Sequence, residues 1–281
     1  MAIYHLSVKY VSRGQGRSAV GASAYRAGEK LYNEHDGLTH DYADKRGINF
    51  TEILLPENAP QEFYNRQTLW NAVEKAERGK NARTAREIEI ALPRELNKDE
   101  QIKLVRNYVN DNFVKRGMCA DISIHSGHRH RKDEEHEGAK HDRIIHKNNP
   151  HAHILLTTRP INEKGFLKSK TVFREYDKRK YVHLWRENWA KVQNKEFEKK
   201  GLSERVSHES HTKRGIKNEP TLHMGHKNTA LERRGIRTEQ GDRNREIIKR
   251  NIQRQEWERR RQKEREQSRN RTRDNDRDLS R

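Results

Sequence analysis

The chain has 281 residues, of which 30% are hydrophobic and 37% are charged. This composition is too polar for one core through the whole length, so we expect a globular domain of about 200 residues and a solvated tail. The formal net charge of +19 indicates a polyanionic partner, which we interpret as nucleic acid, although a generic basic protein has a similar charge. The single cysteine, Cys119, excludes a disulfide framework and a cysteine-based zinc site. No secretory signal and no membrane span are recognisable, so we expect a cytoplasmic protein without membrane insertion.

The first third of the chain predicts a strand and two helices. Residues 3–8 alternate apolar and polar side chains, which is typical of a strand with one buried face. Ser18 is placed to cap a helix that continues to about Leu31. Residues 39–54 are consistent with a hairpin, and residues 69–76 have the period of an amphipathic helix.

The middle of the chain predicts three more strands with the same alternation. They span residues 87–92, 121–125 and 151–156, and a helix capped by Asn97 and ended by Gly117 lies between the first two. Four strands with one apolar and one polar face predict an antiparallel sheet that is buried on one side. The polar face collects histidine and glutamate in place of the usual lysine and threonine, which indicates a functional site.

A last amphipathic helix closes the predicted domain at residues 184–197, with Gly201 in the position of a C-terminal cap. The order β-α-α-β-α-β-β-α fits an α+β sandwich, and we place the globular domain at residues 1–205. Residues 206–241 hold scattered His, Gly and Arg with little periodicity. Residues 242–281 are nearly all charged or amide, so we expect a solvated helix or a disordered tail. The end of the chain looks arbitrary, and we expect the natural protein to be longer.

Three histidines are candidate metal ligands. His151 and His153 are two positions apart on one strand, so their side chains leave the same face and can share one ion. His125 ends another strand and joins them if the two strands are neighbours. Three neutral imidazoles leave most of the charge of a metal ion in place and keep coordination positions open, for example for a phosphate oxygen. The loop between these strands carries five further histidines, which we interpret as incidental: His128, His130, His136, His141 and His146.

Tyr25 is a candidate nucleophile. Small residues surround it in the sequence, so a bulky substrate could approach its phenol. A phenol attacks only when a metal ion, a base or nearby positive charge activates it. A helical tyrosine is more often a core or surface aromatic, and from the residues alone Tyr32, Tyr42 and Tyr64 are equally eligible.

Several of these segments resemble, in the same order, the motifs of the MobA/MobL-type (MobQ class) conjugative relaxases within the HUH endonuclease superfamily. The resemblance spans about residues 1–205 and extends more loosely through residues 220–225. Its motifs lie at residues 1–9, 18–26, 86–93, 121–125 and 149–153.

The resemblance implies a DNA-nicking enzyme. Tyr25 matches the tyrosine that attacks the scissile phosphate at a plasmid origin of transfer and stays joined to the 5′ phosphate until strand transfer and religation. His125, His151 and His153 match the three ligands of a divalent metal ion, usually magnesium or manganese. Glu87 matches an acidic residue that contacts a metal ligand or acts near the tyrosine. Glu89 lies on the same strand face, so the choice between the two stays open, with Glu87 favoured.

The resemblance also implies a fold and partners. The family fold is a five-stranded antiparallel sheet with helices on one face, RRM-like in outline, here followed by the charged tail. The expected partners are single-stranded origin-of-transfer plasmid DNA, relaxosome accessory proteins and a type IV secretion coupling protein. Residues 206–241 would contact DNA that flanks the nick, and the protein would be transferred to the recipient cell attached to the DNA.

Two alternatives remain. Another HUH nuclease, such as a rolling-circle replication initiator, carries its tyrosine C-terminal to the histidine pair, so the N-terminal Tyr25 favours a relaxase. A noncatalytic nucleic-acid-binding protein would use the histidines for a structural metal ion, but such a site is normally closed by four ligands. No obvious fourth ligand accompanies the three histidines in the sequence.

Overall fold

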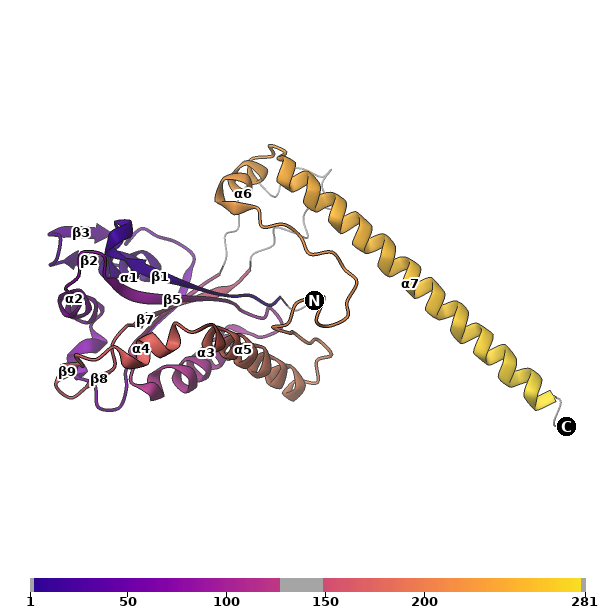
Figure 1. Ribbon diagram of the computed structural model, residues 1–281, viewed down its shortest axis with the longest axis horizontal. Coiled ribbons are helices and arrows are strands. Elements are labelled where there is room, and N and C mark those ends of the chain that lie inside the picture. The colour runs from indigo at the N-terminus through magenta and orange to yellow at the C-terminus, as the bar shows by residue number, and fades with distance from the viewer. Residues whose placement is uncertain (1–2, 127–148, 279–281) are drawn as a thin grey trace. The chain divides into compact units, whose positions relative to one another are not determined.

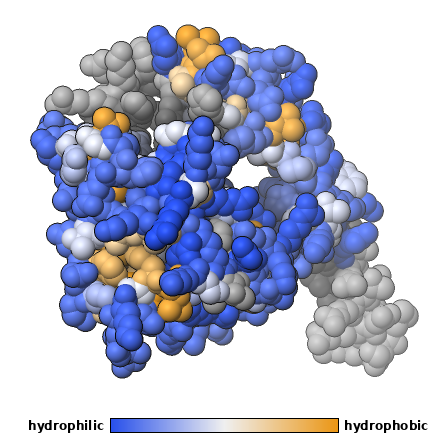
Figure 2. Space-filling view, turned by 60° about the vertical axis from the view of Figure 1, so that its left-hand side comes forward, coloured by the Kyte–Doolittle hydropathy of each residue, from blue (hydrophilic) through white to orange (hydrophobic). Residues whose placement is uncertain are grey.

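The computed structural model describes residues 3–126 and 149–278. The chain divides into two compact units, Met1–His208 and Glu209–Arg281. No helix in the described residues is both long enough and apolar enough to cross a membrane. The face drawn in Figure 2 is mostly hydrophilic, with apolar residues in small separate patches.

The first unit is built on a five-stranded antiparallel sheet with the strand order β1-β5-β7-β6-β4 (Figure 1). This sheet confirms the predicted α+β class. It also has the five strands implied by the family resemblance, one more than the four predicted from the alternation of side chains. The strands are β1 (Leu6–Ser12), β4 (Ile48–Leu54), β5 (Arg83–Ala91), β6 (Ala120–His125) and β7 (His151–Thr157).

Helices α3 (Lys98–Asn112) and α5 (Arg179–Lys199) cover the apolar face of the sheet (Figure 1). The alternating isoleucines of β5, β6 and β7 lie in this core together with Trp185 and Trp189 of α5. Burying each of these large side chains stabilises the fold by about 1.5–3 kcal/mol. The short helix α4 (Thr171–Tyr176) precedes α5.

Helices α1 (Ala19–Ala27) and α2 (Arg66–Ala76) pack on the other face, in addition to the helices predicted for the apolar face. Their second core includes Ala85 of β5 and Leu155 of β7, which share a face with the histidines. The polar face is therefore apolar toward one end, and this end is where α1 and α2 can bury their own apolar side chains.

Two predicted helix starts are confirmed by side-chain caps. The Ser18 hydroxyl accepts a hydrogen bond from the Gly21 amide at 2.9 Å at the start of α1. Asn97 and Glu100 form a reciprocal capping box at the start of α3. The end predicted for α1 is too late, because Gly28 adopts a left-handed conformation (φ 67°) and stops the helix at Ala27.

Two other predictions are corrected by the strand pairing and the glycines. Residues 39–54 do not form a hairpin: β3 (Leu38–Asp41) pairs with β2 (Lys30–Asn33), and β4 pairs with β6 instead. The turn between β2 and β3 contains Gly37 at φ 71°, which suits a tight hairpin. Gly117 ends a short 3-10 turn, η3 (Val114–Arg116), whereas α3 already ends at Asn112.

The remaining small elements of the first unit join these layers. They are η1 (Arg13–Gln15), η2 (Gln61–Tyr64), and the pair β8 (Ile161–Asn162) and β9 (Gly165–Phe166). The second unit contains α6 (Gly225–Arg233) and α7 (Glu239–Asp278), so the charged tail is helical in its described part. Within this unit Arg245 pairs with Glu232 at 2.9 Å, and Ile247 is buried.

Candidate metal centre

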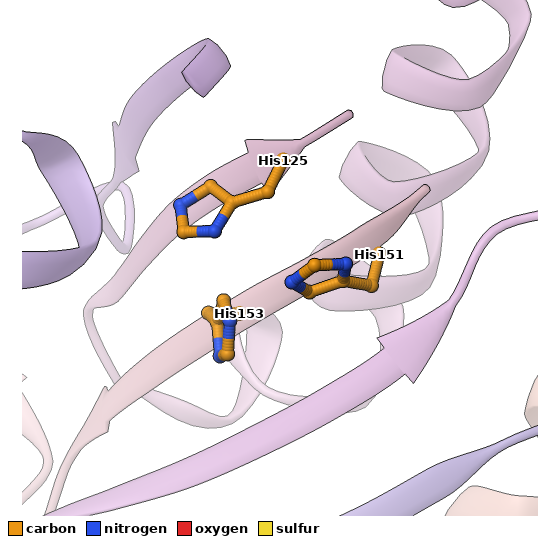
Figure 3. A group of neighbouring side chains, drawn as sticks. All are labelled: His125, His151 and His153. Atoms are coloured by element: carbon orange, nitrogen blue, oxygen red, sulfur yellow. The ribbon is translucent and has the colours of Figure 1, made fainter. Parts of the chain in front are cut away.

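Three histidines meet on one face of the sheet. Strands β6 and β7 are neighbours, and their register puts His125 opposite His151 and Ser123 opposite His153. Figure 3 shows the three rings projecting from the same side of these strands. One nitrogen from each ring lies within 4.8 Å of the other two, so the group can hold a metal ion. Among the described residues, no cysteine, carboxylate or further histidine joins this group.

Hydrogen bonds fix which nitrogen each of two rings offers. The Nε2 atom of His125 lies 2.8 Å from the Arg26 carbonyl oxygen, and Nδ1 of His151 lies 2.9 Å from the Asn149 carbonyl oxygen. A carbonyl oxygen only accepts, so these nitrogens donate and the other nitrogen of each ring keeps its lone pair. Burial lowers the pKa of His125 to about 4, although its hydrogen bond to Arg26 acts in the opposite direction, so this imidazole is neutral near pH 7.

Glu87 orients the third ring. Its side chain is buried, and its Oε1 atom lies 2.9 Å from Nδ1 of His153 and 2.7 Å from Nε of Arg26. Burial alone would raise the pKa of Glu87, but the hydrogen bond from His153 and the charge of Arg26 lower it to about 2. The ionised carboxylate therefore accepts the Nδ1 proton of His153 and leaves Nε2 for a ligand, an arrangement typical of metal-binding histidines.

Glu89 lies on the same strand face but has a different partner. Its Oε2 atom accepts a hydrogen bond from Nζ of Lys9 at 2.9 Å. Burial alone would raise the pKa of Glu89, but the hydrogen bond from Lys9 and the charges of Lys9, His153 and His5 together lower it. Of the two carboxylates considered from the sequence, Glu87 is thus the one that contacts a histidine of the triad.

Helix α1, which carries Tyr25, contacts this centre through the next residue, Arg26, which bonds both His125 and Glu87. The side chain of Tyr25 is 51% exposed. The Tyr25 ring meets Tyr42 edge to face at 5.2 Å between centroids. Nζ of Lys45 lies 3.6 Å from the centroid of the Tyr25 ring and donates a hydrogen bond to the Tyr25 carbonyl oxygen at 2.6 Å.

None of the three other eligible tyrosines lies on this helix. Tyr32 is in β2, Tyr42 directly follows β3 and Tyr64 is in η2, and all three are exposed. Tyr25 is therefore distinguished from them by its neighbour Arg26, which reaches the histidine triad directly.

Buried carboxylates hold α1 along its length. The amide of Ala19 donates to Oε1 of Glu74 at 2.6 Å, and the Ser23 hydroxyl donates to Oδ2 of Asp121 at 2.6 Å. The Arg26–Glu87 pair, with Nη2 2.5 Å from Oε2, secures the C-terminal end. The helix that carries Tyr25 is thus fixed to the sheet and to α2 at its start, its middle and its end.

The residues singled out from the sequence are brought together in part. The three histidines lie close enough together to share a metal ion, and Glu87 is hydrogen-bonded to one of them, His153. The five loop histidines lie outside the described residues. Sequence reasoning missed Arg26 and Lys45. The position of Arg26 directly after Tyr25 was a usable signal for the first, whereas Lys45 lies in a loop without periodicity and gave none.

Comparison with known proteins places the chain in a family. The model of the MobA/MobL family matches residues 17–234. The mobilization protein MobL of Acidithiobacillus ferridurans is 37% identical, over 83% of this chain and 65% of that protein. The probable mobilization protein MobA of Bifidobacterium longum is 33% identical, over 89% of this chain and 48% of that protein.

A solved structure supports the same assignment. A structure described as the molecular basis of vancomycin resistance transfer in Staphylococcus aureus has a TM-score of 0.62 and 33% sequence identity, and the match covers 74% of this chain and all of that one. The chain spans less than two thirds of the length of the curated relatives named above. By its family match and its relatives, this chain belongs to the MobA/MobL family.

Proposed function

We propose that this chain nicks one strand of plasmid DNA at an origin of transfer and carries the cut strand as a covalent tyrosyl adduct. The observation that carries the proposal is that Arg26, the neighbour of Tyr25, bonds His125 and Glu87 beside a triad of histidines that can hold a metal ion. The names of the related proteins, which describe mobilization, support the same role.

The proposed reaction is a transesterification. The Tyr25 oxygen attacks the scissile phosphorus, the phenol loses its proton, and the departing 3′ oxygen gains one. One phosphate ester bond forms as another breaks, so the product is a 5′-phosphotyrosine and a free 3′ hydroxyl. Because no ester bond is lost to water, the 3′ hydroxyl of a strand can attack the adduct and religate the DNA.

His125, His151 and His153 would hold a divalent metal ion, magnesium or manganese in our proposal. Such an ion, when bound, would polarise the phosphate and neutralise charge that develops in the transition state. Glu87 keeps His153 in the tautomer that offers Nε2. Lys45 places a positive charge against the Tyr25 ring, where it stabilises negative charge on the attacking oxygen.

The proposed substrate is single-stranded origin DNA. The strongly basic chain suits a polyanion, and affinity should fall as salt rises because bound phosphates release counterions. Relaxosome accessory proteins and a secretion coupling protein are the further partners that this role requires.

The nucleophile is tested by replacing Tyr25 with phenylalanine, which removes only the attacking oxygen. We expect Tyr25→Phe to abolish covalent protein–DNA adducts with origin oligonucleotides, while binding changes by less than about twofold. Mass spectrometry of tyrosyl-DNA peptides measures the adduct, and Tyr64→Phe, an exposed tyrosine in η2, is the matched control. Undiminished adducts in Tyr25→Phe would remove the nucleophile assignment.

The metal ion is tested by chelation. We expect a chelator to stop adduct formation and added Mg²⁺ or Mn²⁺ to restore it, and full activity in chelator would remove the metal role. A wild-type protein that binds origin DNA tightly under all these conditions but never forms an adduct would instead favour the noncatalytic binding module.

A further inference from the structure

A cavity of about 790 Å³ opens beside Tyr25. Helix α1 lines one side of it, the β2–β3 hairpin lines another, and residues 78–80 after α2 line a third. Its volume lies in the range of roughly 300–1,000 Å³ that is usual for ligand sites. The proposed reaction uses only one residue of this lining, Tyr25, so the cavity is left without a role.

The lining carries more positive than negative charge, with five arginine and lysine side chains and one carboxylate, Asp36. Arg17, Arg78 and Lys80 are exposed, and none of them makes an ion pair within the part of the chain that the structure describes. By contrast, Arg13 and Arg26 also line the cavity but are paired with Glu74 and Glu87. The three unpaired cations are therefore available to an anionic ligand.

The lining also offers aromatic and apolar surface. Tyr42 is 37% exposed, and Leu38 at the tip of the hairpin is 58% exposed. Flat aromatic surface beside cations is the combination that binds single-stranded nucleic acid, because bases stack on the rings while phosphates meet the cations. A nucleotide fits this lining better than a purely anionic or a purely apolar ligand does.

The position of the cavity links it to the metal centre. Tyr25 and Arg26 both line the cavity. The carbonyl oxygen of Arg26 also accepts a hydrogen bond from His125, and its guanidinium bonds Glu87. The hairpin wall approaches α1 closely at Gly21, where an added Cβ would lie 2.9 Å from Cε1 of His40. A strand whose phosphate lies between Tyr25 and the triad has its next nucleotides within reach of the cavity.

We propose that this cavity is a nucleotide subsite that binds single-stranded DNA on one flank of the scissile phosphate. Phosphates of that flank lie against Arg17, Arg78 and Lys80, and a base packs on Tyr42 and Leu38. The location next to the scissile phosphate rests on the proposed nicking function, whereas the binding of nucleotides by the cavity does not.

The test measures how two protein variants bind oligonucleotides of different lengths, so that the effect of each mutation can be compared with the effect of removing nucleotides. Arg78→Ala/Lys80→Ala removes two exposed cations of the cavity, and Lys98→Ala/Lys103→Ala removes two exposed cations of α3 as a control with the same charge change. Affinities are measured by fluorescence anisotropy in chelator, so that no cleavage occurs. The oligonucleotides are shortened one nucleotide at a time from either end.

We expect the cavity variant to bind the full oligonucleotide about tenfold more weakly than the control variant. We also expect this deficit to disappear when one particular flank, and not the other, is shortened to the nick, because the lost contacts are the same ones. Equal weakening of both variants at every length would overturn the subsite, since the cations would then act only through general charge.

The same oligonucleotides separate this proposal from the proposed function. Adduct formation by the wild-type chain without a flank-specific deficit in the cavity variant overturns the subsite and leaves the nicking function standing. A flank-specific deficit without any wild-type adduct supports a nucleotide-binding cavity and rejects the nicking function. Circular dichroism of the variants checks that the loss of exposed cations leaves the fold intact.

Discussion

Arg26 makes two contacts to the candidate metal centre through different parts of one residue. Its backbone carbonyl accepts from His125, and its guanidinium bonds Glu87, which in turn bonds His153. The orientation of two of the three histidines thus depends on where the end of α1 lies. Residues that touch no substrate can therefore change metal affinity in this protein.

Glu87→Gln tests this dependence at a single side chain. The amide keeps the size of the carboxylate but loses the charge that holds the proton on Nδ1 of His153. We expect Mn²⁺ affinity, measured by calorimetric titration, to fall by about 10- to 100-fold. Glu89→Gln is the control, because Glu89 bonds Lys9 and not a histidine. An equal loss in both variants would contradict the assigned role of Glu87.

The sequence predicted that the histidines lie together, but it did not predict the contacts that surround the site. His151 and His153 share a face because side chains alternate along a strand, and this rule needs no tertiary information. Lys45 reaches the Tyr25 ring from a loop whose path depends on the packing of β4 at the edge of the sheet. Such a contact between distant segments has no periodic signature, so sequence reasoning could not find it.

At the scale of elements, Asp121 joins two helices to the sheet. This buried carboxylate of β6 accepts from Ser23 of α1 and, on α2, from Trp70 at 2.9 Å and from Arg66 at 3.0 Å. Arg66 is also buried, and it is further paired with Glu29. The second core between α1, α2 and the sheet is therefore built around a fully paired charge.

Asp121→Asn should destabilise the protein by about 3 kcal/mol, because Arg66 loses its buried counter-charge. Chemical denaturation followed by circular dichroism measures the change. Asp111→Asn is the matched control, since Asp111 forms an exposed i,i+4 pair with Lys115. We expect it to cost less than about 0.5 kcal/mol. Similar losses in both variants would show that Asp121 is not a structural anchor.

A second ion pair joins α6 to α7 and gives a prediction for pH. The hydrogen bond from Arg245 and those from Thr238 lower the pKa of Glu232 to about 2, while burial acts in the opposite direction. The ordinary pKa of a glutamate is about 4.3, so this pair contributes stability above that pH and loses it as the pH falls through about 2. We expect the difference in unfolding midpoint temperature between wild type and Glu232→Gln to become smaller as the pH falls from 5 to 2. A constant difference would contradict it.

Local signals located most elements, and long-range pairing decided the rest. Caps at Ser18 and Asn97 marked helix starts correctly because they depend on neighbouring residues alone. The pairing of β4 with β6 joins segments that lie far apart in the sequence, so the expected hairpin at residues 39–54 was wrong. The packing of α1 and α2 on the histidine face depends on Ala85 and Leu155, two apolar residues at polar positions of the alternation.

At the scale of the whole molecule, the hydrophobic clusters of the described residues all lie within the first unit. The division into a globular domain at residues 1–205 and a charged tail, which the composition predicted, stays a prediction. The second unit is rich in Arg, Lys and carboxylates, above all along α7. The catalytic chemistry and the bulk of the tail are therefore separable in our proposal.

Removing residues 209–281 should leave adduct formation on a short oligonucleotide within about twofold of the full chain. Affinity for longer DNA should fall less steeply with salt in the truncated protein, because fewer cations contact phosphate. Gel analysis of adducts and anisotropy titrations at several salt concentrations measure both effects. A truncated protein that folds, as seen by circular dichroism, but forms no adduct would show that the second unit completes the site.

The three attachments of α1 also have a mechanical meaning. In the proposed adduct, a DNA strand joined to Tyr25 would pull on this helix whenever the strand is under tension. Glu74, Asp121 and Glu87 receive that pull through Ala19, Ser23 and Arg26, and they spread it over α2 and two central strands. The anchoring of α1 thus resists displacement of Tyr25 under load. One of the three anchoring contacts, between Arg26 and Glu87, also orients His153, so a load on the helix would reach the candidate metal centre.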